Sequence, residues 1–203
     1  MLIAKTPPFL SRIFRSLTWD LPVEDKSVYL TFDDGPTPEV TGWVLEQLDA
    51  FGAKATFFCL GCNVKRHPDI FGKILSAGHA VGNHSYSHKK GFRSSVANYV
   101  RDVDRASELI DSVLFRPPYG RILPGQVRRL RERYRVIMWS VLSVDYDKQV
   151  SSRQVVRNVL DNVRPGSIIV FHDSVKASKN LYRALPEVLE QMTSEGYRFR
   201  IIS

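Results

Sequence analysis

Short apolar runs alternate with helix-length segments along the chain, and this alternation restricts the possible folds more than any other feature of the sequence. Runs rich in β-branched and aromatic residues lie at 27–32, 55–59, 113–115, 135–139, 167–171 and 197–202. Segments with helical periodicity lie at 37–52, 65–77, 94–111, 124–133, 151–162 and 177–195. Strands and helices that alternate in this way form βα units with parallel strands. Several runs are apolar throughout, which is typical of strands covered on both faces.

These units predict an α/β fold with parallel strands in a single domain. The 203 residues fit one domain, and they contain neither an internal repeat nor a Gly/Ser linker. Six or seven βα units suit either a doubly wound sheet or a barrel, and the lack of a nucleotide-binding loop favours the barrel. Thr37 is expected to cap the first of the long helices, with Pro38 in its first turn.

Charge and hydropathy narrow the range of partners and locations. Lys and Arg outnumber Asp and Glu by 29 to 21, and the resulting net charge of +8 favours nucleic acid, anionic lipid or acidic glycan. No motif interleaves basic and aromatic residues, so we expect no binding to nucleic acid. The longest apolar runs, such as 168–171, are far shorter than a membrane span of roughly 18 to 20 residues. Residues 1–22 lack the apolar core of a secretory signal, so a cytoplasmic location is expected.

Residues 1–24 precede the first strand and are predicted to form an N-terminal extension. Its apolar side chains would share one side of a helix that also carries basic residues. The apolar residues are Phe9, Leu10, Ile13, Phe14 and Leu17, and the basic ones are Arg12 and Arg15. Such a helix packs over one end of a barrel, or it makes peripheral contact with an anionic membrane. The second interpretation would suit a lipid-linked sugar as substrate.

Two adjacent carboxylates, Asp33 and Asp34, follow the first apolar run and precede Gly35 and Pro36. In parallel α/β folds the carboxyl ends of the strands form the active face. Neighbouring side chains on a strand point in opposite directions, but at a turn both can enter one cleft. In one cleft, the repulsion between the two negative charges raises the pKa of one carboxyl group and favours the binding of a metal ion. Alone, this sequence is more often a solvated turn, so its meaning depends on the other motifs.

The segment 83–88 carries two histidines, His84 and His88, which would share one face if the segment is helical. Imidazoles at this spacing suit a divalent metal. Two histidines and one aspartate leave a coordination position open for water, as catalytic metal sites do. A non-haem iron oxygenase uses the same ligand types, but its usual antiparallel scaffold does not match this order of strands and helices.

Three further segments follow later strands. Arg116 begins an Arg-Pro-Pro-Tyr-Gly sequence, whose prolines fix a turn that can aim a guanidinium and backbone N–H groups inward. His172 stands where the apolar run 168–171 ends, and Asp145 follows the run that ends at Trp139. A carboxylate in that position could orient and charge the histidine from a neighbouring strand end.

These five segments, in their order along the chain, resemble the motifs of the polysaccharide deacetylases of the NodB-homology class, which form carbohydrate esterase family four. The resemblance covers about 27–200 and implies a distorted (β/α)7-type barrel, with 25–203 as the catalytic domain. It implies a metal-dependent hydrolase that removes acetyl groups from N-acetylated, and in some cases O-acetylated, carbohydrate. The implied cofactor is a divalent metal, most often Zn, with Co, Ni and Fe as alternatives.

Carried over residue by residue, the resemblance assigns a role to each motif. The metal ligands would be Asp34, His84 and His88. Asp33 would be the general base, held by Arg116, and His172 would be the general acid, oriented by Asp145.

The resemblance also predicts the pocket for the acetyl group. The backbone N–H of Tyr119 would donate to the oxyanion, and Tyr146 and Val170 would line the pocket. Leu142 departs from the family, whose fourth motif usually carries an acidic residue there, so the departure bears on local hydrogen bonding and substrate fit. Because Asp145 is retained, we expect catalysis. Two alternatives stay open: a deacylase of a lipid-linked sugar at the cytoplasmic membrane face, and a degenerate, non-catalytic sugar-binding module.

Overall fold

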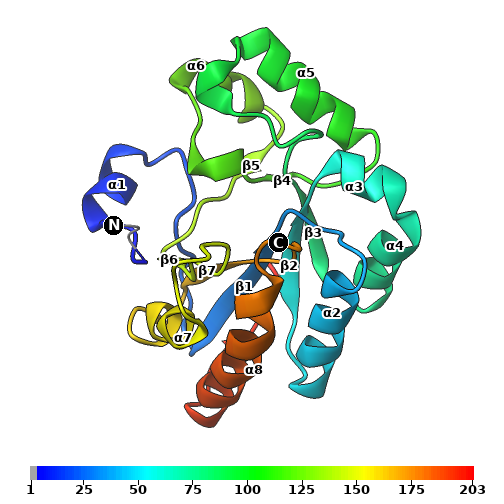
Figure 1. The fold of residues 1–203 in the computed structure, drawn as a ribbon. Helices are drawn as coiled ribbons and strands as arrows, with labels where there is room; N and C mark the ends of the chain where they lie inside the picture. Colours follow the sequence, from blue (N-terminus) through cyan, green and yellow to red (C-terminus); the bar gives the residue numbers. More distant parts are fainter. Residues whose placement is uncertain (1–3) are drawn as a thin grey trace.

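Eight parallel strands form one curled sheet in the computed structural model, which describes residues 4–203 (Figure 1). The strands are β1 (Ser27–Asp33), β2 (Ala55–Cys59), β3 (Ala80–Asn83), β4 (Leu114–Phe115), β5 (Arg135–Val136), β6 (Val141–Leu142), β7 (Ile168–His172) and β8 (Arg198–Phe199). Their order across the sheet is β5-β4-β3-β2-β1-β7-β6, and β8 pairs with the first residues of β1. The predicted α/β fold with parallel strands is therefore confirmed.

The sheet curls into an incomplete barrel rather than a closed ring. Its edge strands β5 and β6 have two residues each, and within residues 4–203 they do not pair with each other. The N-terminal segment lies along these edges, where Lys5 bridges Val141 and Thr18 bridges Ile137. This segment therefore covers backbone groups that the short edge strands would otherwise expose.

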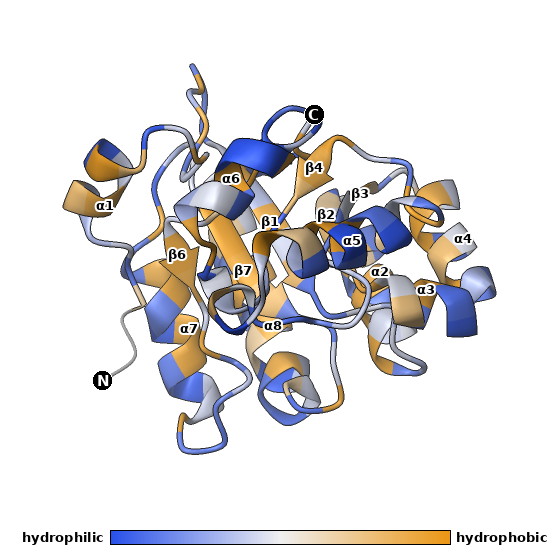
Figure 2. Cartoon of the chain, turned by 90° about the horizontal axis from the view of Figure 1, so that it is seen from above, coloured by the Kyte–Doolittle hydropathy of each residue, from blue (hydrophilic) through white to orange (hydrophobic). Residues whose placement is uncertain are grey.

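Helices surround the sheet, and all but the first of them bury side chains. They are α1 (Pro8–Ile13), α2 (Val40–Ala50), α3 (Gly61–Arg66), α4 (Pro68–Ser76), α5 (Val96–Ser107), α6 (Pro124–Leu130), α7 (Ser152–Leu160) and α8 (Ser178–Ser194), with short 3₁₀ turns η1 (Gly91–Arg93) and η2 (Pro118–Gly120). The main core includes side chains of β1, β2 and β7 and the buried faces of α2, α7 and α8. At its centre the Phe32 ring stacks on Phe57 and Phe171, with centroids 5.1 and 6.0 Å apart. Figure 2 shows hydrophobic strands and a helix α7 whose bands alternate between hydrophobic and hydrophilic, as expected with one buried face.

The register of the central strands brings polar residues to one edge of the sheet. Asp33, the last residue of β1, is paired with His172, the last residue of β7. Asn83 ends β3 opposite Phe115 of β4, and Arg116 follows directly. Because parallel strands all end on the same side, the side chains at these ends share one face of the molecule.

The structure adds strand β3, which was not predicted, and divides one predicted helix. Strand β3 is not visible as an apolar run in the sequence, because Gly82 and Asn83 have low strand propensity. The segment 65–77 is not one helix but parts of two, because Pro68 cannot continue α3 and instead starts α4.

The start of α2 also differs from the prediction, since Thr37 is not its cap. The helix begins at Val40, after Glu39, which has a φ of +67°. The Thr37 N–H donates to the Thr41 hydroxyl at 2.7 Å, and this hydroxyl donates to Asp173 at 2.5 Å. Thr41 therefore ties the start of α2 to the residue that follows β7.

The helix predicted near the N-terminus is short and exposed. Helix α1 has six residues, none of them buried, and Figure 1 shows it beside β6 and apart from the other helices. Phe9, Ile13 and Phe14 are 57%, 66% and 45% exposed, whereas Leu17, beyond the helix, packs against the core cluster that contains Tyr99. Packing of the extension on the barrel stays a prediction. Contact of α1 with an anionic membrane stays a prediction. Among residues 4–203, no helix is long and apolar enough to cross a bilayer.

Candidate active site

Asp33 and Arg116 form a buried ion pair at the carboxyl end of β1. Asp33 is 4% exposed and Arg116 is fully buried. Nη1 of Arg116 donates to Oδ1 of Asp33 and to the Thr31 hydroxyl, both at 2.7 Å. Burial alone would raise the pKa of Asp33, but the charge and hydrogen bond of Arg116 oppose burial and hold this pKa below its usual range. Asp33 is therefore an ionised carboxylate in a fixed orientation.

Asp34 leaves the strand in a left-handed conformation, with a φ of +80°. The next N–H, that of Gly35, donates to Oδ1 of Asp173 at 3.0 Å, and a Cβ atom on Gly35 would collide with the same carboxylate. Asp173 is fully buried, and burial raises its pKa to about 8. This turn brings the adjacent carboxylates Asp33 and Asp34 into the same cavity.

His84 and His88 lie in a loop rather than on a helix, so it is not a shared helical face that brings them together. His88 has a φ of +55°, yet the two rings converge, with centroids 5.2 Å apart. The carboxylate of Asp102, on α5, accepts the N–H groups of Tyr86 and Ser87 and the Ser87 hydroxyl. Asp102 therefore holds the loop in the shape that lets both imidazoles face Asp34.

Asp34, His84 and His88, called the metal triad below, fit a divalent metal ion. Oδ1 of Asp34 lies 3.2 Å from Nε2 of His88 and 3.6 Å from Nε2 of His84, and it has no hydrogen-bond partner among the described residues. Nδ1 of His84 lies 2.8 Å from the carbonyl of Arg116, which places a proton on Nδ1 and a lone pair on Nε2. Burial lowers the pKa of His88 to about 4, so its ring is neutral at pH 7. Two neutral imidazoles and a carboxylate are the ligands of many catalytic metal sites.

His172 and Asp145 form a second buried pair. Nδ1 of His172 lies 2.8 Å from Oδ1 of Asp145, and the His172 N–H donates to Oδ2 at 2.8 Å. Burial would lower the pKa of His172, but the charge and hydrogen bond of Asp145 outweigh it and raise this pKa to about 9. The imidazole is therefore protonated at neutral pH, and it lines the same cavity as Asp33.

A cavity of about 1040 Å³ lies over these groups, and Tyr119, Tyr146 and Val170 all line it. The Tyr146 ring stands edge-on to His172, with centroids 4.8 Å apart, and the Tyr119 ring lies 4.5 Å from that of His88. Tyr119 has a φ of +61°, and within residues 4–203 its N–H donates to no other backbone group. The volume lies just above the roughly 300 to 1,000 Å³ of ordinary ligand pockets, far more than an acetyl group needs.

Leu142 stands where the resemblance leads us to expect an acidic residue. It is buried, lines the cavity and packs against Val144 and Val170. The substitution gives this wall of the cavity an apolar surface. Asp145 keeps both of its bonds to His172 without an acidic neighbour at 142.

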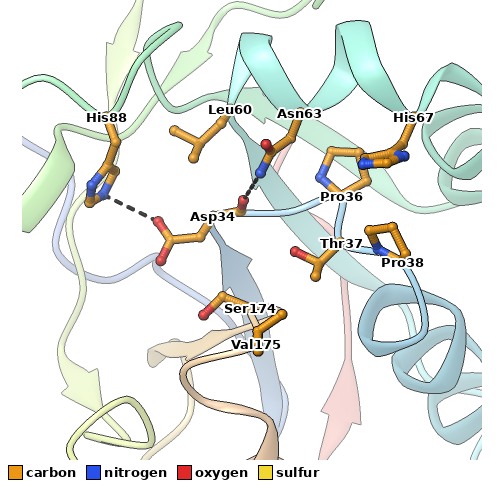
Figure 3. Close-up of a pocket in the computed structure, with 10 residues that line it drawn as sticks. All are labelled: Asp34, Pro36, Thr37, Pro38, Leu60, Asn63, His67, His88, Ser174 and Val175. Atoms are coloured by element: carbon orange, nitrogen blue, oxygen red, sulfur yellow. Dashed lines mark hydrogen bonds and ion pairs between the residues drawn. The ribbon is translucent and has the colours of Figure 1, made fainter.

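A second hollow, of about 410 Å³, lies beside Asp34 (Figure 3). Asp34 and His88 line this hollow as well as the larger cavity. Figure 3 shows the Asp34 carboxylate directed toward His88, while the Asp34 carbonyl accepts a hydrogen bond from Asn63 at 2.8 Å. The metal triad therefore borders two open spaces, a suitable arrangement for a ligand longer than one sugar.

Sequence reasoning did not identify three residues that hold the site: Thr31, Asp102 and Asp173. Thr31 and Asp173 lie within two residues of Asp33 and His172, so their position at the strand ends was a usable signal. Asp102 had no such signal, because it is one of two acidic residues on an amphipathic helix. Only the packing of α5 against the histidine loop reveals its contacts.

Asp102→Ala is expected to weaken zinc binding roughly 10- to 100-fold, the usual effect of removing a group that supports a metal ligand. Without this carboxylate, the N–H groups of Tyr86 and Ser87 lose an acceptor and the position of His88 is no longer fixed. Competition with a chromophoric chelator measures the affinity. Asp104→Ala, a half-exposed position on the same helix, is the control and should bind zinc normally. Wild-type affinity in Asp102→Ala would contradict this supporting role.

Comparison with known proteins gives a consistent family relationship. The sequence model of the family described as polysaccharide deacetylase matches residues 20–135. A peptidoglycan-N-acetylglucosamine deacetylase of Bacillus cereus is 36% identical over 186 residues, which are 88% of this chain and 67% of that protein. Another B. cereus protein of the same description is 31% identical over 92% of this chain and 91% of its own length. The peptidoglycan-N-acetylmuramic acid deacetylase PdaC of Bacillus subtilis is 32% identical, and the match covers 38% of its length.

Solved structures confirm the predicted fold. The Bc1960 peptidoglycan N-acetylglucosamine deacetylase superposes with a TM-score of 0.85 at 33% identity, covering 97% of this chain and 95% of that one. PdaC from B. subtilis gives a TM-score of 0.80 at 30% identity over 90% of both chains. BA3943 from Bacillus anthracis, described as a pseudoenzyme of carbohydrate esterase family four, gives 0.77 at 25% identity over 91% of this chain and 66% of that one.

Proposed function

The chain belongs to the polysaccharide deacetylase family and is a hydrolase of carbon–nitrogen bonds in acetylated carbohydrate, and we propose that it removes acetyl groups from an N-acetylated glycan with a divalent metal. One observation carries this proposal. An ionised carboxylate, Asp33, and a protonated imidazole, His172, line the same cavity as the metal triad. A base, an acid and a metal site around one cavity are the groups that amide hydrolysis requires.

The first step is attack of water on the acetyl carbonyl. A divalent cation on the metal triad would supply Lewis acidity, which lowers the pKa of water and polarises a carbonyl. Asp33, held in place by Arg116, accepts the proton of the attacking water. The N–H of Tyr119 donates to the developing oxyanion, because this group has no other backbone acceptor among the described residues.

The second step is departure of the amine. An amide nitrogen cannot leave as an anion, so it must receive a proton as the tetrahedral intermediate collapses. His172 donates this proton, and Asp145 orients the ring and keeps it charged. Tyr146, edge-on to His172, forms the adjacent wall of the acetyl pocket together with Val170.

The proposed substrate is an N-acetylated glycan longer than one sugar. The relatives described above are named as peptidoglycan deacetylases. The two hollows that share Asp34 and His88 offer space on more than one side of the reacting group. The family also includes a pseudoenzyme, which makes a non-catalytic sugar-binding role the main alternative. The complete set of base, acid and metal triad in this chain argues against that role.

Acetate release by the zinc-loaded protein tests the proposal. The panel contains N-acetylglucosamine oligomers, acetylated xylan and a polyprenyl-linked N-acetylhexosamine, each with and without chelator. We expect chelator-sensitive release from at least one N-acetylated substrate, and the panel then identifies the substrate class. Absence of release from every substrate, with zinc bound, would favour the non-catalytic role.

The alkaline limb of the pH profile of kcat is expected near pH 9. The pKa of His172 is raised above its ordinary value of 6.5 to about 9, so the acid keeps its proton at neutral pH and loses it as the pH rises through about 9. Asp145→Asn removes the charge that raises this pKa, so the limb should move to lower pH. Initial rates of acetate release across the alkaline range measure it. Identical limbs in the wild type and Asp145→Asn would contradict the assignment of His172 as the acid.

A further inference from the structure

We infer that the substrate carries an anionic group close to the acetylated sugar, and that Lys90, Arg121 and Lys176 bind this group at the mouth of the cavity. The inference rests on the deacetylase function proposed above. It narrows the substrate class from N-acetylated glycan to N-acetylated glycan with a carboxylate or phosphate near the reacting acetamido group.

The three cations are positioned over the aromatic lining of the cavity. All three are exposed residues that line it. Nζ of Lys90 lies 5.2 Å from the centroid of the Tyr119 ring, and Nζ of Lys176 lies 5.0 Å from that of Tyr146. The Arg121 guanidinium lies 5.2 Å from the centroid of the Phe92 ring. Cation–π contacts of this length attract a cation to the ring face, so these charges are directed to the cavity surface.

The aromatic rings connect the cations to the reacting groups. Tyr119, beneath Lys90, is the ring that lies 4.5 Å from His88 of the metal triad. Tyr146, beneath Lys176, is the ring that lies 4.8 Å from His172. Each of these two cations is therefore one ring away from a residue of the proposed chemistry. An anion that reaches them lies on the reacting sugar or on its direct neighbour.

The cations approach the site from two sides. Lys90 follows the histidine loop after β3, and Arg121 directly follows η2, after β4. Lys176 lies between β7 and α8. Strands β3 and β4 lie on one side of β1 in the sheet and β7 lies on the other. A sugar over the end of β1 therefore has positive charge on both flanks.

In the part of the chain that the structure describes, the three cations at the mouth of the cavity have no negative charges in the cavity to balance them. Among the described residues that line it, the carboxylates are Asp33 and Asp34. Asp33 is neutralised by Arg116, and Asp34 belongs to the metal triad. Within residues 4–203, the cations Lys90, Lys176 and Arg121 take part in no ion pair. A cleft lined by one sign of charge concentrates ligands of the opposite sign.

The ligand chemistry is that of an anion on an N-acetylated sugar, with two sources to distinguish. One source is a carboxylate, such as the lactyl group of an N-acetylmuramic residue. The other is a diphosphate that joins the sugar to a lipid carrier. A neutral N-acetylglucosamine oligomer has neither group and serves as the reference substrate.

The test compares two triple variants that each lose three positive charges. Lys90→Gln/Arg121→Gln/Lys176→Gln removes the cations of the cavity. The control is Lys73→Gln/Arg128→Gln/Lys179→Gln, whose positions are exposed and do not line the cavity. The substrates are a neutral N-acetylglucosamine tetramer, a tetramer that alternates with N-acetylmuramic acid, and an N-acetylglucosamine diphosphate on a short prenol.

The cavity variant should lose roughly tenfold or more in kcat/KM on an anionic substrate and little on the neutral tetramer, while the control keeps the wild-type ratio. Loss on the muramic tetramer alone or on the diphosphate alone identifies the anion. An unchanged ratio of anionic to neutral kcat/KM for both anions overturns the inference but leaves the proposed function standing. If no substrate releases acetate, the proposed function fails. The inference is then tested by binding alone, with calorimetric Kd values for the anionic substrates. Asp33→Asn is compared with Asp33→Asn that also carries the three cavity substitutions, and equal Kd values overturn the inference.

Discussion

Asp33→Asn is expected to lower kcat for acetate release by on the order of 10² or more while zinc binding is retained. The asparagine has nearly the same size and keeps one oxygen for Arg116, but it cannot accept a proton from the attacking water. The metal triad does not include Asp33, so its ligands stay in place. Turnover and zinc stoichiometry, measured on the same sample, separate loss of the base from loss of the metal.

The control for Asp33→Asn must account for stability. Removing one charge of a buried ion pair costs about 3–5 kcal/mol, because Arg116 stays buried without its partner. The free energy of unfolding is therefore measured beside the rate, and rates are compared at temperatures where both proteins are folded. Asp20→Asn, which breaks an exposed pair with Arg164, should keep full activity. Turnover close to that of the wild type in Asp33→Asn would contradict its assignment as the base.

His84→Ala is expected to lose zinc and activity together. Its Nε2 offers a lone pair to the metal, and its Nδ1 bond to the Arg116 carbonyl fixes the ring. Removing a ligand should weaken zinc binding by more than the roughly 10- to 100-fold typical of removing a group behind a ligand. Zinc titration followed by competition with a chelator measures the affinity, and acetate release at each zinc concentration measures the activity.

His79→Ala provides the matched control for His84→Ala. His79 is also buried, and its Nδ1 accepts the N–H of Ala55 at 3.2 Å, away from the cavity. Its loss should lower stability but leave zinc affinity unchanged. Normal zinc affinity in His84→Ala would remove this residue from the metal triad.

Strand ends explain why the positions of several candidate site residues were predictable from the sequence. Asp33 and His172 each end a buried apolar strand, and Arg116 directly follows one. A buried parallel strand is recognisable in the sequence as a continuous apolar run, and parallel strands place their carboxyl ends on one face. In the structure the last residues of β1 and β7, Asp33 and His172, are paired. The fold class was predictable for the same reason, because alternation of strands and helices is itself the pattern of a parallel sheet.

The remaining features depend on contacts between distant residues, which local patterns do not contain. The spacing of His84 and His88 would place both on one face of a helix, but the segment is a loop with positive φ values that hydrogen bonds to Asp102 hold. The cap assigned to Thr37 failed because Asp173, far along the chain, bonds to Gly35 and to the helix start. The closure of the sheet by the N-terminal segment likewise joins parts more than a hundred residues apart.

A zinc titration of turnover tests the central claim most directly, that the metal triad supports deacetylation of an N-acetylated glycan. The protein is stripped with chelator, dialysed and titrated with zinc while acetate release from an N-acetylated oligosaccharide is followed. We predict no release without metal, a linear rise with added zinc and saturation at one ion per chain. Release that is unaffected by stripping would contradict the claim, as would a protein that binds one zinc ion and releases acetate from no N-acetylated substrate.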